Sequence, residues 1–553
     1  MRISTGVSLS YTRATAEDER SDAVKKTPTG LAALVVALLC ASTVSAQVKE
    51  ADVTGGRVAG VVANGISSFK GIPFAAPPTG ALRWKAPQPV KPWSGVKQAS
   101  AYAPACVQDA TFPKLFGAPQ ALSEDCLYLN VWTPAKSASD VLPVMVWIYG
   151  GGFVGGQTSV PVYDGARLAE KGVVLVSVAY RLGVFGFFAH PELSRESGKA
   201  SGNYGLQDMI AGLQWVKANI AKFGGDATRV TIFGESAGGI AVSMLAASPA
   251  AKGLFHRGIS ESGGNFAPPR QASEGGQNAP TLKVAEASGQ EFLAKLKVAD
   301  IKAARDLPAE KLQAAVGPGL QANFWPVFDG DVLPGDQYEL YRAGRFNDTP
   351  VLIGTNSDEG ALFAQPGMNP ARFESLVRDG YGKQADSVLA AYAHATDADA
   401  TRAGKDIMRD TLFAWPTWTW ATLQSQKGKG HAYVYYFDHR TLQSPNGANH
   451  GAEIAFVFRN LVGGGPVGLG GPARPQDNEM SELMSTYWVN FAKNGDPNGP
   501  GLPRWPAFTS SSPNLMFFDT KSSARPVPNM TQIKALDGYF AWRRSEAKAK
   551  GTH

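Results

Sequence analysis

Residues 230–240 read Val-Thr-Ile-Phe-Gly-Glu-Ser-Ala-Gly-Gly-Ile and contain a G-x-S-x-G pentapeptide at the end of a short β-branched and aromatic run. This pattern is typical of a strand that ends in a tight turn and continues as a helix. A Cβ at Gly234 or Gly238 would crowd such a strained turn. The turn would expose the hydroxyl of Ser236 and aim the backbone N–H of Ala237 toward a developing negative charge. An isolated G-x-S-x-G can equally be a glycine-rich turn, so its meaning depends on partners elsewhere in the chain.

Composition sets the broad class of this protein. The chain has 553 residues, of which 44% are hydrophobic and 18% charged, which is an ordinary globular composition. The formal net charge of +6 is spread along the chain without a sustained basic run. So small an excess does not argue for a nucleic-acid or membrane-surface partner. Residues 47–553 contain no linker, repeat or long charge block, so we expect them to form a single catalytic domain.

The N-terminal region has the pattern of an export signal. Lysines precede an apolar run at residues 31–40, and small residues end at Ala46, which suits cleavage directly after it. The run is about half of the ~20 residues that a membrane-spanning helix needs, so we expect no stable membrane anchor. We therefore predict a signal region over residues 1–46 and a secreted or periplasmic mature protein. Residues 1–23 are polar and look dispensable, and translation could instead begin after them.

Removal of the signal would leave Cys106 and Cys126 as the only cysteines of the chain. Two cysteines in an exported protein usually form a disulfide. The alternative is a pair of separate buried thiols.

Five apolar runs predict strands, several of them buried on both faces. They lie at residues 144–148, 173–179, 230–233, 351–353 and 432–437. Residues 204–223 carry apolar side chains near helical spacing and are followed by two glycines, so we expect a helix there. Strands that alternate with helices indicate an α/β fold, with a mostly parallel sheet covered by helices on both faces.

Two further regions look like helical insertions that cap the sheet, residues 270–345 and the tryptophan-rich residues 413–420. A third, residues 463–471, reads Gly-Gly-Gly-Pro-Val-Gly-Leu-Gly-Gly. It lacks the G-K-[ST] ending of a phosphate-binding loop, so we predict a flexible surface loop.

A serine hydroxyl is a weak nucleophile at neutral pH and needs a base within hydrogen-bonding reach. The chain has seven histidines, and most flank the pentapeptide, end the chain, or lie in helical or strand-like contexts. His450 instead lies in the loop of residues 447–453, Gly-Ala-Asn-His-Gly-Ala-Glu, after a predicted strand. Such a loop at the carboxyl edge of the sheet could bring His450 over Ser236, although any single histidine is more often structural.

A third group must orient the imidazole and stabilise its cation. Residues 354–360 read Gly-Thr-Asn-Ser-Asp-Glu-Gly directly after a predicted strand. Two acids lie side by side there, and the residues alone do not choose between Asp358 and Glu359. Either could also be a solvated loop acid or a helix cap. The order serine, acid, histidine matches the order in the α/β-hydrolase arrangement.

Three consecutive glycines follow another predicted strand, in the stretch Trp-Ile-Tyr-Gly-Gly-Gly-Phe of residues 147–153. Consecutive glycines let backbone N–H groups approach a substrate oxygen closely. A triple glycine alone is more often a simple loop. Its place after a buried strand and upstream of a candidate nucleophile favours a site for an oxyanion.

Many ordered motifs extend this pattern over nearly the whole mature chain. They lie at residues 69–78, 123–132, 149–153, 202–206, 223–226, 234–238, 358–360, 450–454, 487–492 and 495–498. In these motifs the chain resembles the type-B carboxylesterases, an α/β-hydrolase family that includes bacterial p-nitrobenzyl esterases and cholinesterases. The resemblance implies an α/β-hydrolase fold with helical insertions that cap the active site.

The resemblance also implies roles at matching positions. Ser236 would be the nucleophile, His450 the base, and Glu359, from the Asp-Glu-Gly motif, the acid. The donors of the oxyanion hole would be Gly151, Gly152 and Ala237. The substrate pocket would be lined by Phe324, Trp325, Phe413, Trp415 and Trp418. Cys106 and Cys126 match the first disulfide of the family, Ser262 matches a supporting serine near the triad, and Arg83, Glu124 and Arg181 match structural ion pairs.

These features predict a secreted serine esterase that hydrolyses neutral, apolar or xenobiotic carboxylic esters through an acyl-enzyme. We expect a small-molecule ester as its partner, no cofactor, no metal, no nucleic acid, and a monomer. The loop between Cys106 and Cys126 has no tryptophan, which argues against a choline-selective enzyme. The alternatives are a hydrolase of a specialised ester, lactone, carbamate, amide or polyester, or a non-catalytic interaction protein on the same fold.

Overall fold

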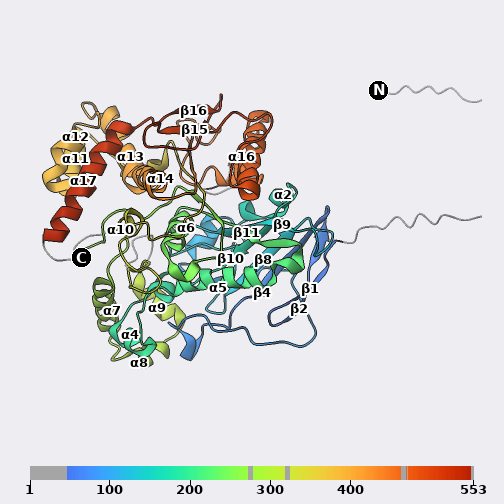
Figure 1. The fold of residues 1–553 in the computed structure, drawn as a ribbon. Coiled ribbons are helices and arrows are strands. Elements are labelled where there is room, and N and C mark those ends of the chain that lie inside the picture. Colours follow the sequence, from blue (N-terminus) through green and yellow to red (C-terminus); the bar gives the residue numbers. More distant parts are fainter. Residues whose placement is uncertain are drawn as a thin grey trace, which may run out of the picture. The chain divides into compact units, whose positions relative to one another are not determined.

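The strand that leads to Ser236, β11 (Gly225–Glu235), lies inside a large mixed sheet (Figure 1). The computed structural model describes residues 47–271, 278–317, 324–461, 467, 469 and 471–549. The expected signal region and most of the glycine-rich loop at residues 463–471 lie outside the described residues. Within the described part, this sheet has 11 strands in the order β16-β15-β14-β13-β12-β11-β9-β10-β8-β4-β3.

The central strands of the sheet are parallel, from β15 through to β10, and antiparallel strands complete both edges. Besides β11 they are β3 (Val61–Ala63), β4 (Ile66–Pro73), β8 (Tyr128–Thr133), β9 (Leu142–Ile148), β10 (Val174–Val178), β12 (Arg257–Glu261), β13 (Val351–Asn356), β14 (Ala432–Phe437), β15 (Asn514–Phe518) and β16 (Ser523–Pro526). Two small sheets are formed by β1 (Glu50–Val53), β2 (Gly56–Ala59) and β5 (Val96–Gln98), and by β6 (Ala105–Cys106) and β7 (Leu122–Ser123).

Helices cover both faces of the large sheet. Helices α5 and α6 pack on each other and on β11, whereas α16 packs on β9 and β11 (Figure 1) and also contacts α15. The helices are α1 (Thr111–Leu115), α2 (Ala166–Ala169), α3 (Gly183–Phe187), α4 (Pro191–Ser197), α5 (Tyr204–Asn219), α6 (Ala237–Ala247), α7 (Leu282–Leu296), α8 (Ile301–Arg305), α9 (Ala309–Val316), α10 (Gln337–Arg342), α11 (Pro370–Tyr381), α12 (Ala385–Leu389), α13 (Asp397–Arg409), α14 (Trp415–Lys427), α15 (Ile454–Phe458), α16 (Pro475–Asn494) and α17 (Met530–Ala549).

The predicted α/β fold with a mostly parallel, doubly covered sheet is confirmed. All five predicted strands lie in the large sheet, and the predicted helix at residues 204–223 is α5 with a short 3₁₀ extension. The sequence analysis missed β12, because its residues Arg-Gly-Ile-Ser-Glu do not form an apolar run. Pairing with β11 on one side and β13 on the other nevertheless buries most of this strand.

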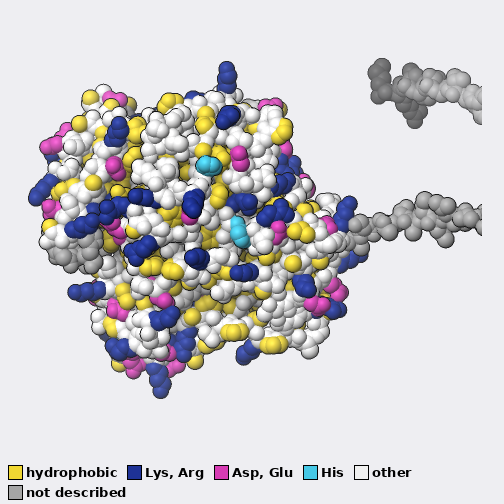
Figure 2. All heavy atoms as spheres, in the orientation of Figure 1, with side chains coloured by type: hydrophobic (Ala, Val, Ile, Leu, Met, Phe, Trp, Pro, Cys, Tyr) yellow, Lys and Arg dark blue, Asp and Glu magenta, His cyan; other side chains and the backbone are white. Residues whose placement is uncertain are grey.

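The surface of the described residues carries charged side chains of both signs (Figure 2). Figure 2 shows basic and acidic side chains interspersed over the visible face. Among the helices of the described residues, none combines the length and the apolar character needed to cross a bilayer.

Candidate active site

The turn at Ser236 is strained in the way that the pentapeptide predicts. β11 ends at Glu235, Ser236 has φ 55° and ψ −123°, and α6 begins at the next residue. A positive φ is unusual for a residue with a side chain and costs of order 1–3 kcal/mol. A Cβ at Gly234 would lie 2.5 Å from the carbonyl oxygen of Ile148, and one at Gly238 would lie closer still. Both glycines are therefore required by close backbone approach.

His450 lies against the carboxylate of Glu359. The Nδ1 atom of His450 is 2.5 Å from Oε2 of Glu359, which is fully buried. The other oxygen of Glu359 accepts hydrogen bonds from the Ser262 hydroxyl at 2.5 Å and from the backbone N–H of Asn356 at 2.7 Å. These contacts fix the carboxylate, and the carboxylate in turn orients the imidazole.

The neighbouring acid points elsewhere. The carboxylate of Asp358 lies 3.7 Å from the ammonium group of Lys405, and the backbone N–H of Asp358 donates to the carbonyl of Ala448. Of the two acids that the sequence left open, Glu359 is the one that touches His450.

A second carboxylate, which the sequence analysis did not single out, faces the other side of the imidazole. Oε1 of Glu235 lies 3.2 Å from Nε2 of His450. Burial by itself lowers the pKa of His450, but the carboxylates of Glu235 and Glu359 outweigh this effect and raise the pKa to about 9. Burial also raises the pKa of Glu235 to about 8. The sequence does contain a signal for this role of Glu235, because an acid at the end of an otherwise apolar, buried strand is unusual.

Two more buried acids lie behind the histidine. Oε2 of Glu453 accepts from the side-chain amide of Asn356 at 2.5 Å, and Glu261 accepts from the indole N–H of Trp488 at 2.6 Å. Burial raises the pKa of Glu453 to about 7 and that of Glu261 well above its usual range. Burial disfavours the ionised forms of these carboxyl groups, as it does for Glu235, whereas the cation of His450 favours the ionised forms of Glu235 and Glu453.

The glycine loop after β9 presents free backbone donors. Gly151 and Gly152 have φ values of 107° and 62°, which favour glycine. Neither N–H has a hydrogen-bond acceptor among the described residues. Ala237 is the first residue of α6, and N–H groups in the first turn of a helix have no intrahelical acceptor. Gly151, Gly152 and Ser236, the residue before Ala237, line one cavity, so the N–H groups of Gly151 and Gly152 can act on the same bound group.

Comparison with known proteins decides the family. The model of the carboxylesterase family matches residues 43–535, nearly all of the chain. The chain belongs to the carboxylesterase family. It is a carboxylic ester hydrolase with an α/β-hydrolase fold.

Characterised relatives of this carboxylesterase include esterases of different specificity. It is 38% identical to a fumonisin B1 esterase of Sphingopyxis macrogoltabida over 82% of this chain and 83% of that protein. It is 36% identical to the para-nitrobenzyl esterase of Bacillus subtilis (strain 168) over 87% and 97%, and 35% identical to an acetylcholinesterase of Bungarus fasciatus over 86% and 83%. Among solved structures, a PNB esterase aligns with a TM-score of 0.78 and 33% identity, over 88% of this chain and 99% of that one.

A cavity of about 670 Å³ opens beside Ser236 in this carboxylesterase. This volume is within the range of about 300–1,000 Å³ that is typical of small-molecule sites. Ser236 and His450 both line it. The other lining side chains are largely apolar, and include Phe112, Leu115, Phe116, Val160, Tyr163, Leu362 and Phe363.

The lining of this cavity does not include the side chains expected there, Phe324, Trp325, Phe413, Trp415 and Trp418. Phe324 and Trp325 are buried in aromatic clusters with Phe292 and Phe153, respectively. Trp415 is fully buried against Phe540 of α17, and Trp418 lines a separate small cavity. Phe413 is buried behind His450. Aromatic residues on α1 and after Glu359 form the wall instead.

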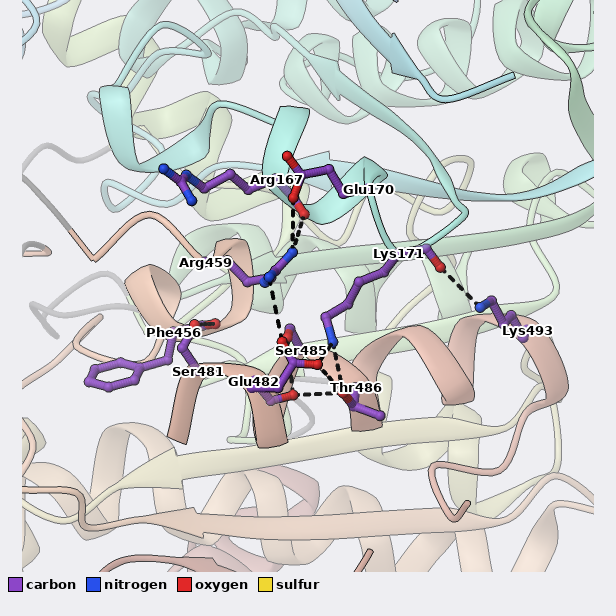
Figure 3. Close-up of polar contacts among 10 residues, drawn as sticks. All are labelled: Arg167, Glu170, Lys171, Phe456, Arg459, Ser481, Glu482, Ser485, Thr486 and Lys493. Atoms are coloured by element: carbon purple, nitrogen blue, oxygen red, sulfur yellow. Dashed lines mark hydrogen bonds and ion pairs between the residues drawn. The ribbon is translucent and has the colours of Figure 1, made fainter. Parts of the chain in front are cut away.

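The segment that carries His450 is anchored by a polar network at its C-terminal end (Figure 3). Helix α15 follows the histidine loop, and Arg459 is the residue directly after the helix. The guanidinium of Arg459 donates to the carbonyl of Arg167 at 3.0 Å and pairs with Glu170 at 3.2 Å and Glu482 at 3.5 Å. Lys171 pairs with Glu482 as well. The network therefore ties α15 to the end of α2 and to α16.

The expected disulfide and ion pairs are formed. Cys106 and Cys126 form a disulfide, and the chain between them includes α1. The carboxylate of Glu124 lies 2.6 Å from the guanidinium of Arg83. The expected pair at Arg181 is formed with Asp208, at 2.7 Å.

Proposed function

We propose that this carboxylesterase cleaves its substrates through an acyl-enzyme, with Ser236 as nucleophile, His450 as general base and Glu359 as the acid that orients it. The proposal is carried by the contact of His450 Nδ1 with Glu359, in a cavity that also exposes Ser236. No hydrogen bond joins Ser236 to His450 within the described residues. Such contacts often tighten only when substrate binds.

In the proposed reaction, Ser236 Oγ attacks the ester carbonyl while His450 Nε2 accepts the hydroxyl proton. The carbonyl oxygen becomes an oxyanion that the N–H groups of Gly151, Gly152 and Ala237 stabilise. His450 then gives the proton to the leaving alcohol, and the acyl group remains on Ser236. Water, deprotonated by His450, attacks the acyl-enzyme, and the carboxylic acid leaves as His450 returns the proton to Ser236 Oγ. Glu359 and Glu235 both favour the imidazolium that forms in each half of the cycle.

The part of the substrate beside the reacting bond is proposed to be apolar and uncharged. Phe112, Phe116, Leu362 and Phe363 supply most of the apolar wall. Among the described residues that line the cavity there is no tryptophan, the best partner for a quaternary ammonium group.

Export of the mature chain is also part of the proposal. The signal pattern ending at Ala46 supports it, and so does the disulfide between Cys106 and Cys126, because disulfides persist mainly in oxidising compartments.

Labelling with an organophosphate tests the nucleophile directly. Wild-type enzyme should be inactivated with one phosphoryl group on the peptide that contains Ser236, and Ser236→Ala should be neither active nor labelled. A Ser197→Ala variant is the control, because Ser197 is exposed at the end of α4. Labelling of a different serine in an active Ser236→Ala variant would overturn the assignment.

A further inference from the structure

The entrance of the cavity combines exposed apolar side chains with one cation. Leu115 and Leu362 both line the cavity, yet 58% and 56% of their surfaces are exposed. They belong to different segments, α1 and the turn after Glu359. An exposed leucine is common, but two at the entrance of one apolar cavity offer a surface that a bound chain would cover.

The cation at the entrance is Lys114, the residue directly before Leu115 on α1. It lines the same cavity and is exposed. Its ammonium group forms no hydrogen bond or ion pair with any described residue. The other charged residues of the lining, Glu235 and His450, face each other in the interior. Lys114 is therefore the charged residue of the lining that the outer end of a bound substrate would contact.

Helix α1, which carries Lys114, is held in place by packing and by a covalent link. The ring of Phe112, two residues before Lys114 on α1, packs so closely on Gly155 that a Cβ on Gly155 would overlap the ring. The disulfide between Cys106 and Cys126 closes the loop that contains α1. The helix is thus held against the glycine loop of the oxyanion donors, with its lysine at the entrance.

We propose that the preferred substrates are amphipathic esters whose apolar chain covers Leu115 and Leu362 and whose far end carries an anionic group, such as a carboxylate, that pairs with Lys114. This inference rests on the proposed esterase function and narrows its substrate class. The reacting end of the substrate stays uncharged, and the charge lies at the entrance, where water still solvates it.

The test compares p-nitrophenyl monoesters of α,ω-dicarboxylic acids of increasing length with p-nitrophenyl esters of unbranched acids of equal length. The measured quantity is the ratio of kcat/KM for the charged ester to that for its uncharged partner. In the wild type this ratio should rise once the chain is long enough to reach Lys114, and should fall as salt is added. Pairing at an exposed site predicts a gain of about two- to fivefold.

Three variants at two positions, with a matched control for each position, separate the contribution of the charge from that of the apolar side chains. Lys114→Met should abolish the gain and Lys114→Glu should invert it, whereas Lys383→Met, at an exposed lysine away from the cavity, should keep it. Leu362→Ser should weaken the dependence on chain length, and Leu442→Ser, at a leucine that is 70% exposed elsewhere, should not. Because each ratio is taken within one variant, loss of folded enzyme cancels.

A ratio that does not change with chain length, or that survives in Lys114→Glu, would overturn this inference. Hydrolysis of the uncharged esters and labelling of Ser236 would then persist. Failure of the proposed function would instead remove both of these, so the two failures are distinguishable.

Discussion

The ring of Phe413 lies nearly parallel to the imidazole of His450, with 4.6 Å between the ring centroids and 29° between the planes. Phe363 contacts the same imidazole at 5.3 Å and 65°. Phe413 belongs to a π-helical turn, Asp410–Ala414, between α13 and α14. Such turns are rare and often occur at functional sites. The two rings enclose an imidazole whose nitrogens face Glu359 and Glu235.

Replacing Phe413 by leucine should therefore lower kcat more than it raises KM, because the imidazole loses a stacking surface. Aromatic pairs contribute about 0.5–1.5 kcal/mol beyond burial, which corresponds to at most about a tenfold loss. Phe373→Leu is the matched control, since Phe373 is also buried and contacts a histidine, His394, that does not line the cavity. Equal losses of kcat in Phe413→Leu and Phe373→Leu would show that the substitutions affect only the packing of the core.

Glu359→Gln should reduce kcat by several orders of magnitude, whereas Asp358→Asn should change it little. The amide cannot stabilise the imidazolium that forms on His450, and removal of the orienting acid in a triad typically costs about 10⁴-fold. Asp358 contacts Lys405 instead of the imidazole. Steady-state kinetics on a p-nitrophenyl ester, with circular dichroism to verify folding, decide the ranking. The reverse order would assign the role to Asp358.

The acidic limb of the kcat/KM profile should lie above pH 6.5, the value of a free imidazole. The base must be unprotonated, and the facing carboxylates raise the pKa of His450, so activity appears only as pH rises through that higher value. Glu235→Gln removes one of these carboxylates and should move the limb down by roughly one pH unit, an electrostatic change of about 1.4 kcal/mol.

Glu453→Gln serves as the control for the pH profile. Glu453 is equally buried, but Glu235 and Glu359 contribute more to the raised pKa of His450. Its substitution should move the limb less than Glu235→Gln does. An acidic limb that is identical in wild type and Glu235→Gln would contradict the electrostatic assignment.

The strand–turn–helix arrangement around Ser236 could be predicted from sequence because its constraints are local. Gly234, Ser236 and Gly238 lie within five residues, and the two glycines are required by backbone atoms close in space. The pocket wall could not be predicted in this way. Trp415 is buried because its ring meets Phe540 and its indole N–H donates to Asp537, both on α17 near the other end of the chain. No local pattern around Trp415 reports that contact.

The acid that contacts His450 could be predicted only in part from the sequence. Asp358 and Glu359 are adjacent and chemically similar, and the residues alone did not separate them. The difference arises because β13 ends at Asn356, whose backbone N–H binds Glu359, while α13 supplies Lys405 to Asp358. The resemblance to a family indicated Glu359, and the geometry gives the physical reason for that choice.

Gly238→Ala should destabilise the fold by about 1–3 kcal/mol or more, as expected for overpacking. The new methyl group would overlap the carbonyl of Ile148 in β9, and a central strand cannot move away easily. Gly538→Ala, in α17, is the control because no atom lies within 4 Å of the added group. Alanine is a better helix former by about 1 kcal/mol, so this variant should not lose stability. Thermal unfolding of both proteins tests the contrast, and an unchanged Tm in Gly238→Ala would contradict it.

A choline ester should be a poorer substrate than its uncharged isostere. Phe112, Phe116, Phe363 and Tyr163 are aromatic, but they are weaker cation partners than tryptophan, and Lys114 at the entrance repels a quaternary ammonium group. We expect kcat/KM for 3,3-dimethylbutyl thiobutyrate to exceed that for butyrylthiocholine, and Lys114→Met to narrow the difference about two- to fivefold, the range expected for an exposed charge. The two thioesters share the acyl group and the shape of the alcohol, so only charge differs. A tenfold preference for the choline ester, which corresponds to about 1.4 kcal/mol, would mean that Glu235 or the aromatic wall binds cations. The assignment of the cavity to uncharged groups would then be wrong.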